Sequence, residues 1–379
     1  MGTRDSQGFQ VQESRRFSSA LELLIAACLI ALVAPSLARA GTAQLQDPTP
    51  GGPHLTFTAT SGEANHVLLL FGFGGYRVVD LGAAITAGPG CAPVNSSEVF
   101  CAFIFAFDEP PKVDILLGDL NDFASISPTV SSEATVDGED GADELEISGG
   151  CALEQEVCKN LLRGGPGDDT LRASTFALLD GGADGDTMEG SDAQVDYSAR
   201  VNPVIVVGNG VADDGEAGEG DNVSRNVLIV LGGSAGDTFT DVDALGRGGN
   251  DTFISTGARG VFCDGGAGDD AFSGGVHADF CFGGPGDDEL NGGGGPDDLE
   301  GGRDADTIRG GPGRDYLVGG RRGDLLIGGD GREFAISGGR GNDTLRARDG
   351  LRERVEGGPG SDRARVDRID VVRSIEAFF

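Results

Sequence analysis

Apolar side chains recur at every ninth position over a long stretch of the chain. Beginning at Gly265, eight consecutive nine-residue units each place an apolar residue at the eighth position: Phe272, Cys281, Leu290, Leu299, Ile308, Leu317, Leu326 and Ala335. About six residues of each unit turn and about three extend, so the pattern predicts a short strand with one inward side chain. Such short strands are not stable alone, and we predict that successive units stack on one another.

The same units have glycine at their first two positions and an acid at their sixth. The acids are Asp270, Asp279, Asp288, Asp297, Asp306, Asp315, Asp324 and Glu333. Glycine permits positive φ and close backbone approach, which tight stacked turns require. Looser copies of the unit lie at 138–145, 164–172, 181–189, 232–240, 246–254, 338–346 and 357–365. The repeat therefore extends through most of the chain.

The flanking segments have a different pattern. "HLTFTAT", "HVLLLFGF" and "YRVVDLG", between 54 and 82, predict strands joined by turns. The last segment, "RVDRIDVVRSIEAFF" at 365–379, has no glycine and predicts a cap over the C-terminal edge. We predict five parts: a signal segment at 1–40, a β-rich N-terminal cap at 41–135, degenerate repeats at 136–264, a regular β-roll at 265–346, and the last repeat with a C-terminal cap at 347–379.

Residues 1–40 have the pattern of a secretory signal. Arg15 and Arg16 precede an apolar run at 23–34, and Ala38 and Ala40 have the spacing of a cleavage site. The run is short for a membrane span, so an uncleaved anchor is the weaker alternative. We predict an extracellular protein that is cleaved after Ala40 and has no membrane span after cleavage.

The cysteines beyond that site fall as close neighbours in the sequence. The neighbours are Cys91 with Cys101, Cys151 with Cys158, and Cys263 with Cys281. In an oxidising compartment, this spacing favours three local disulfides over a metal cluster.

Charge limits the possible partners. The chain has 62 acidic and 28 basic side chains, a net charge of -34 and 67 glycines. This charge opposes compaction, so bound cations, a basic partner or permanent disorder are the possible answers, and a hydrophobic fraction of 38% argues against disorder. Nucleic acid and anionic membranes are poor partners because their phosphates are repelled. Calcium fits best, since it accepts six to eight oxygen ligands in flexible geometry, whereas zinc prefers His or thiolate.

The units, "GGPGDDELN" at 283–291 among them, resemble the RTX, or haemolysin-type, calcium-binding nonapeptide. The resemblance implies an all-β, right-handed parallel β-roll with two nonapeptides per turn. It also implies several calcium ions between same-side loops of successive turns, bound by backbone carbonyls and by sixth-position Asp side chains. The side-chain ligands that it implies are Asp169, Asp186, Asp237, Asp251, Asp270, Asp279, Asp288, Asp297, Asp306, Asp315, Asp324 and Asp343.

This sequence departs from the family pattern at a few positions. Glu333 replaces the sixth-position Asp, His277, Asp304 and Arg322 replace the fourth glycine, and one residue is added before 338. With two units per turn, Cys263 and Cys281 lie one full turn apart on neighbouring strands, with Cα atoms about 4.8 Å apart, which permits a disulfide. The alternative is two reduced cysteines that fill the core.

Catalytic motifs are weak in this sequence. The motif H-E-x-x-H is absent, and the only histidines are His54, His66 and His277. Ser234 lies in a G-x-S-x-G match, but the residues after it continue as a repeat rather than as the helix of a nucleophile elbow. Paired acids such as Asp287 and Asp288 recur in successive units, which favours ligands over a catalytic dyad. We predict a non-enzymatic protein with a structural or adhesive role at the cell surface or in the matrix. A secreted hydrolase or a toxin component with calcium-binding repeats is the alternative.

Overall fold

The computed structural model describes residues 41–46, 54–72, 75–102, 112–126, 133–148, 160–331 and 333–379. The predicted signal at 1–40 and the predicted pair of Cys151 and Cys158 lie outside these residues. In the described part of the chain every regular element is a β-strand, and no helix there is long and apolar enough to cross a bilayer.

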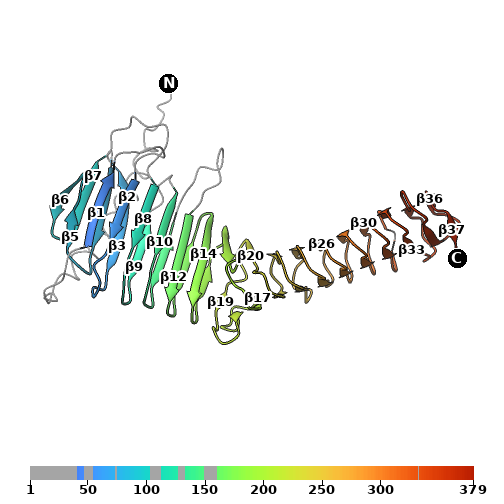
Figure 1. Cartoon of the computed structure of the whole chain (residues 1–379), viewed down its shortest axis with the longest axis horizontal. Helices are drawn as coiled ribbons and strands as arrows, with labels where there is room; N and C mark the ends of the chain where they lie inside the picture. The colour runs from blue at the N-terminus through green and yellow to red at the C-terminus, as the bar shows by residue number, and fades with distance from the viewer. Residues whose placement is uncertain are drawn as a thin grey trace, which may run out of the picture. The chain divides into compact units, whose positions relative to one another are not determined.

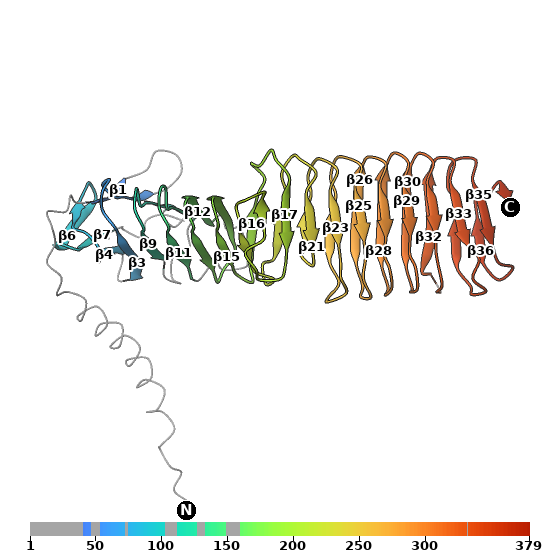
Figure 2. The same cartoon turned by 90° about the horizontal axis from the view of Figure 1, so that it is seen from below.

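The described strands form three sheets, here called sheets 1, 2 and 3, with 17, 9 and 11 strands. Figure 1 and Figure 2 show the strands stacked side by side in chain order from β8 to β36. Sheet 1 has the spatial order β5 (Ile85–Ala87), β1 (Gly41–Gln46), β2 (His54–Thr58), β8 (Lys112–Leu116), β10 (Ala134–Asp137), β12 (Asn160–Pro166), β14 (Ala177–Ala183), β16 (Ala193–Asp196), β20 (Ile229–Leu231), β22 (Ala244–Leu245), β24 (Phe262–Asp264), β26 (Phe280–Pro285), β28 (Asp298–Arg303), β30 (Tyr316–Arg321), β32 (Ala335–Arg340), β34 (Arg354–Glu356) and β36 (Val371–Arg373).

Sheets 2 and 3 take the alternate strands of the chain. Sheet 2 has the order β6 (Cys91–Asn95), β7 (Glu98–Ala102), β4 (Gly75–Asp80), β3 (His66–Gly72), β9 (Phe123–Ile126), β11 (Glu144–Ile147), β13 (Thr170–Ala173), β15 (Thr187–Glu189) and β19 (Asn222–Val223). Sheet 3 has the order β18 (Gly215–Glu216), β17 (Val204–Val207), β21 (Thr238–Thr240), β23 (Thr252–Ile254), β25 (Ala271–Ser273), β27 (Glu289–Asn291), β29 (Thr307–Arg309), β31 (Leu325–Ile327), β33 (Thr344–Ala347), β35 (Arg363–Val366) and β37 (Ala377–Phe378).

Register confirms a parallel β-roll with two nonapeptides per turn. In sheet 1, Cys281 pairs with Leu299 and Leu299 with Leu317, and in sheet 3, Leu290 pairs with Ile308, each step covering 18 residues. The eighth-position side chains are buried from Phe272 to Leu326. Because strands of the two sheets alternate along the chain, each turn contributes one inward apolar side chain from each side.

The roll is less regular before the nonapeptide array. One turn covers 17 residues from Asn160 to Ala177 and 14 from Val230 to Ala244. Between β16 and β20, which pair directly with each other, the chain inserts β17, β18 and β19, and this insertion separates sheet 2 from sheet 3.

Both ends of the described chain differ from the repeat. At the N-terminal end the pairs β1–β2, β3–β4, β4–β7 and β6–β7 are antiparallel, while β2 and β3 already pair in parallel with β8 and β9. At the C-terminal end β36 and β37 form the last turn, parallel to β34 and β35.

One predicted core position is wrong. Ala335 is partly exposed, and Ile336 is fully buried and pairs with Leu317 instead. The added residue therefore lies between Glu333 and Ile336, where the side chain of Phe334 is exposed. A strand entry tolerates such an extra residue because the inward register recovers within one alternation.

Two of the predicted disulfides are confirmed. Cys91 and Cys101 join the antiparallel strands β6 and β7. Cys263 and Cys281 join β24 to β26 across one turn, with Cα atoms 4.7 Å apart.

Candidate cation-binding loops

Acidic side chains stand directly before the strands of sheets 2 and 3 along most of the roll. We call this set the long column, and among the described residues it comprises Asp122, Asp143, Asp169, Asp186, Asp221, Asp237, Asp251, Asp270, Asp288, Asp306, Asp324, Asp343 and Asp362. All of them are buried. Each closes the loop that leads from sheet 1 into the next strand, so the column runs along one edge of the roll.

The opposite edge has a shorter series. The loops that lead into sheet 1 end in Asp279, Asp297, Asp315, Glu333 and Glu353, which we call the short column. These five side chains are also buried. Earlier loops on this edge end in residues such as Val261.

Within both columns, one carboxylate oxygen links successive turns. The backbone N–H of Asp270 donates to Oδ1 of Asp288 at 2.8 Å, and that of Asp288 donates to Oδ1 of Asp306 at 2.9 Å. On the opposite edge the N–H of Asp279 donates to Oδ1 of Asp297 at 2.9 Å. Each side chain thus caps the loop of the turn before it, which fixes the position of its second oxygen.

That second oxygen, Oδ2, is buried and accepts no hydrogen bond in most of these side chains. Among the described residues that the sequence analysis predicted as ligands, this holds for Asp169, Asp186, Asp251, Asp270, Asp288, Asp297, Asp306, Asp315, Asp324 and Asp343. The first glycine of each loop makes room for it, since a Cβ on Gly283 would lie 2.2 Å from Oδ2 of Asp288. A buried carboxylate oxygen without a partner is costly, and a cation ligand removes that cost.

Two predicted ligands differ from the rest. Oδ2 of Asp237 accepts the N–H of Gly233 at 2.8 Å, and Oδ2 of Asp279 accepts that of Gly275 at 3.3 Å. In both loops the fourth residue is not glycine, and the second glycine lies outside the left-handed region. Such a loop folds onto its own carboxylate, so these two side chains have less capacity for a cation.

The other replacements of the fourth glycine keep the usual loop. Asp304 and Arg322 both have positive φ, at 76° and 74°. They lie one turn apart, and Nε of Arg322 pairs with Oδ1 of Asp304 at 2.7 Å. The Oδ2 atoms of Asp306 and Asp324, in the same two loops, still have no hydrogen-bond partner. Positive φ at the fourth position, rather than glycine itself, is therefore what preserves the free oxygen.

The columns raise the pKa of their own carboxyl groups. Burial, with a smaller contribution from neighbouring carboxylates, raises the pKa of Asp306 to about 8 and that of Asp297 to about 7, from an ordinary value of 3.8. Burial likewise raises the pKa of Asp324 to about 7. A divalent cation reverses this effect because it favours the charged form.

Four members of the long column were not among the predicted ligands: Asp122, Asp143, Asp221 and Asp362. Asp143 and Asp362 lie in looser copies of the unit, and the signal that finds them is the acid two residues before a buried apolar side chain. Asp221 has no such repeat around it, and its Oδ2 accepts a hydrogen bond from the hydroxyl of buried Tyr197 at 2.7 Å.

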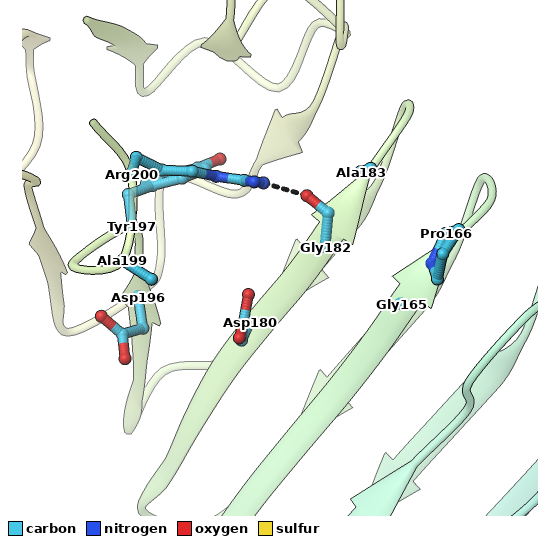
Figure 3. A pocket seen from close by; sticks show the side chains of 9 residues that line it. All are labelled: Gly165, Pro166, Asp180, Gly182, Ala183, Asp196, Tyr197, Ala199 and Arg200. Carbon is cyan, nitrogen blue, oxygen red and sulfur yellow. Dashed lines mark hydrogen bonds between the residues drawn. The ribbon is translucent and has the colours of Figure 1, made fainter. Parts of the chain in front are cut away.

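A cavity of about 330 Å³ lies next to the insertion. Figure 3 shows Asp180, Asp196 and Arg200 around it, with Arg200 donating to the carbonyl of Gly182. Ser234 lies close by, and its hydroxyl contacts the carbonyl of Arg200 at 3.5 Å. Strand β21 follows Ser234 where a nucleophile elbow requires a helix.

The donor set of the columns fits a hard cation. Stacked carboxylate oxygens and loop carbonyls suit calcium, which tolerates variable ligand number and geometry. A family model of the RTX calcium-binding nonapeptide repeat, in four copies, matches residues 159–175, 264–290, 291–326, 309–334 and 335–364. No curated protein matches the chain.

Proposed function

The chain belongs to the proteins with RTX calcium-binding nonapeptide repeats, and from this premise we propose that it is a secreted protein whose roll folds as it binds several calcium ions. Its role is structural or adhesive, at a cell surface or in a matrix. The observation that carries the proposal is the series of buried Oδ2 atoms without hydrogen-bond partners, repeated once per turn along each column.

Calcium supplies the positive charge that this series requires. The Asp side chains hold Oδ2 at a fixed place in each loop, because Oδ1 is bonded to the preceding turn. Without a cation, stacking these loops buries like charges, so the free energy of binding becomes free energy of folding. Extracellular calcium is in the millimolar range that weaker oxygen-ligand sites require.

Export is supported by the apolar run before Ala38 and Ala40 and by the two disulfides, which persist in oxidising compartments. Proteins with this repeat are typically secreted. N-terminal sequencing of the exported protein should begin at Gly41, and a chain that retains residue 1 outside the cell contradicts cleavage after Ala40.

We extend the proposal to a role without catalysis. The support is that Ser234 and the acidic pairs lie in loops of the repeat itself, where their neighbours recur in successive turns. A hydrolase requires one site that differs from all the other loops, so assays with ester, peptide and glycoside substrates should give no turnover.

The decisive experiment is a calcium titration of the purified chain. In chelator the chain should be expanded, and about 5 mM calcium should increase its β-sheet circular dichroism and reduce its hydrodynamic radius. Magnesium at the same concentration is the matched control and should do much less, because it requires a tighter octahedral site. Identical spectra and radii in chelator, magnesium and calcium would refute calcium-dependent folding.

A further inference from the structure

The short column changes its chemistry at its C-terminal end. Glu333 and Glu353 take the positions that Asp297 and Asp315 have in earlier turns. The loop that ends in Glu353 also has Asp349 at its second position, where the regular units have glycine. Three carboxylates from two successive turns therefore meet where an ordinary pair of repeat loops would bring two.

These three side chains converge. One carboxylate oxygen from each of Glu333, Asp349 and Glu353 lies within 4.8 Å of the other two. The side chains of Glu333 and Glu353 are only 3% and 2% exposed. Oε1 of Glu333 and both carboxylate oxygens of Glu353 accept no hydrogen bond from the described residues.

Asp349 is held in place by the backbone around it. Its Oδ2 accepts the N–H of Gly331 at 3.2 Å, and its Oδ1 accepts that of Leu351 at 2.8 Å. The first bond ties Asp349 to the loop of Glu333, so the cluster spans two turns through the backbone as well as through its side chains. Glycine at the second position in the other loops offers no such ligand.

We propose that Glu333, Asp349 and Glu353 form a separate calcium site that binds through side-chain carboxylates and fastens the last turns to the regular array. Calcium–oxygen distances of about 2.3–2.6 Å allow ligands on opposite sides of one ion to be up to about 5.2 Å apart. Magnesium, with distances near 2.0–2.1 Å, allows only about 4.2 Å. Three carboxylates also offer up to six oxygens, which meets the coordination number of calcium with little help from the backbone.

An ion at this site acts directly on the C-terminal strands. The backbone of Glu353 accepts the N–H of Val371 at 2.8 Å and donates to Oδ1 of Asp370 at 3.1 Å. Fixing the Glu353 loop thereby fixes the start of β36, the last strand of sheet 1. The site uses none of the repeat Asp side chains, so it does not depend on the proposed function of the columns.

The test counts calcium ions by equilibrium dialysis on the full chain and on three variants. Glu353→Gln and Asp349→Asn each remove one ligand charge, and Asp330→Asn removes the same charge from an exposed position in the loop of Glu333. We expect Glu353→Gln and Asp349→Asn to bind one ion fewer than the unmodified chain, or to bind that ion at least about tenfold more weakly. Asp330→Asn should bind the full number.

Hydrogen exchange gives a second, local measurement. In saturating calcium, amides of β34 and β36 should exchange about tenfold faster in Glu353→Gln than in Asp330→Asn, while β26 and β28 should be unchanged. If Glu353→Gln does not fold, Asp349→Asn decides, because Asp349 is only partly buried. The full ion count with unchanged affinity in Asp349→Asn or a folded Glu353→Gln overturns the site. One ion lost from a chain whose columns bind none would support it and refute the column proposal.

Discussion

The two edges of the roll differ in how far their acidic columns extend. The long column begins at Asp122 and reaches Asp362, whereas the short column begins only at Asp279. Before that point, loops into sheet 1 end in residues such as Phe176 and Val261. The earlier turns therefore have one buried carboxylate each, and the turns from β26 onward have two.

This difference explains why only part of the chain has a regular nine-residue period. With acid at both edges, the two halves of a turn have the same requirements, so both become nine residues long and the register repeats every 18. With acid at one edge, the other loop is free to vary, and turns of 14 and 17 residues occur. Regularity in the sequence thus reports ligand density rather than the extent of the β-roll.

The largest expected effect separates the two regions by pH. Raised pKa values, about 8 for Asp306 and about 7 for Asp297, mean that the metal-free roll binds protons that the unfolded chain releases. Stability is therefore present at acid pH and is lost as pH rises from about 4 to about 8. In chelator, the turns from β26 to β32 should be more protected from hydrogen exchange at pH 5 than at pH 8, and more strongly so than β9 and β11.

Calcium should reverse that dependence. Binding requires the charged carboxylates, so calcium affinity should rise with pH over the same interval. Magnesium at equal ionic strength controls for screening. A metal-free roll whose unfolding midpoint rises between pH 5 and pH 8 would contradict the assignment of these carboxyls as buried and unpaired.

The next effect concerns the boundary where the short column begins. The disulfide joins Cys263, in the last turn without a short-column acid, to Cys281, in the first turn with one. Closing a loop of this length contributes about 3 kcal/mol to the free energy of unfolding. Cys263→Ala with Cys281→Ala should lower calcium-saturated stability by about that amount, measured by chemical denaturation.

Position is what makes this prediction informative. Loss of the Cys91–Cys101 bridge, by Cys91→Ala with Cys101→Ala, should destabilise the N-terminal strands and leave exchange in β24 and β26 unchanged. Equal effects of the two double variants on β24 would show that the boundary has no special need of a covalent link.

Sequence reasoning predicts most of the regular array because its determinants are local. The sixth-position Asp of each unit, the inward side chains from Phe272 to Leu326 and the bridge at Cys263 all follow from counting in nines. Asp221 does not, because its turn contains an insertion and the strand pairing that aligns it is long-range.

The finer features depend on backbone conformation. Both Asp304 and His277 replace a fourth glycine, yet only Asp304 adopts positive φ. The sequence pattern treats Asp279 and Asp297 alike, and only the loop geometry separates them. The same holds for the Glu333 cluster, where Asp349 meets its partners through a turn that no nine-residue count requires.

The smallest expected effect compares two neighbours within the short column. Oδ2 of Asp297 accepts no hydrogen bond, whereas Oδ2 of Asp279 accepts the N–H of Gly275 at 3.3 Å. Asn in place of Asp keeps an acceptor for the preceding turn and removes the charge. Asp297→Asn should weaken calcium-dependent folding by about tenfold in the calcium midpoint, and Asp279→Asn should change the midpoint by less than about twofold.

His277→Gly supplies the matched gain of function for that pair. Glycine at the fourth position permits positive φ, which in the other loops accompanies a free Oδ2. The variant should shift the calcium midpoint to a lower concentration, and adding Asp279→Asn to it should cancel the shift. If His277→Gly changes nothing while Asp297→Asn and Asp279→Asn weaken folding equally, then loop conformation does not decide which carboxylates bind calcium, and every sixth-position acid contributes alike.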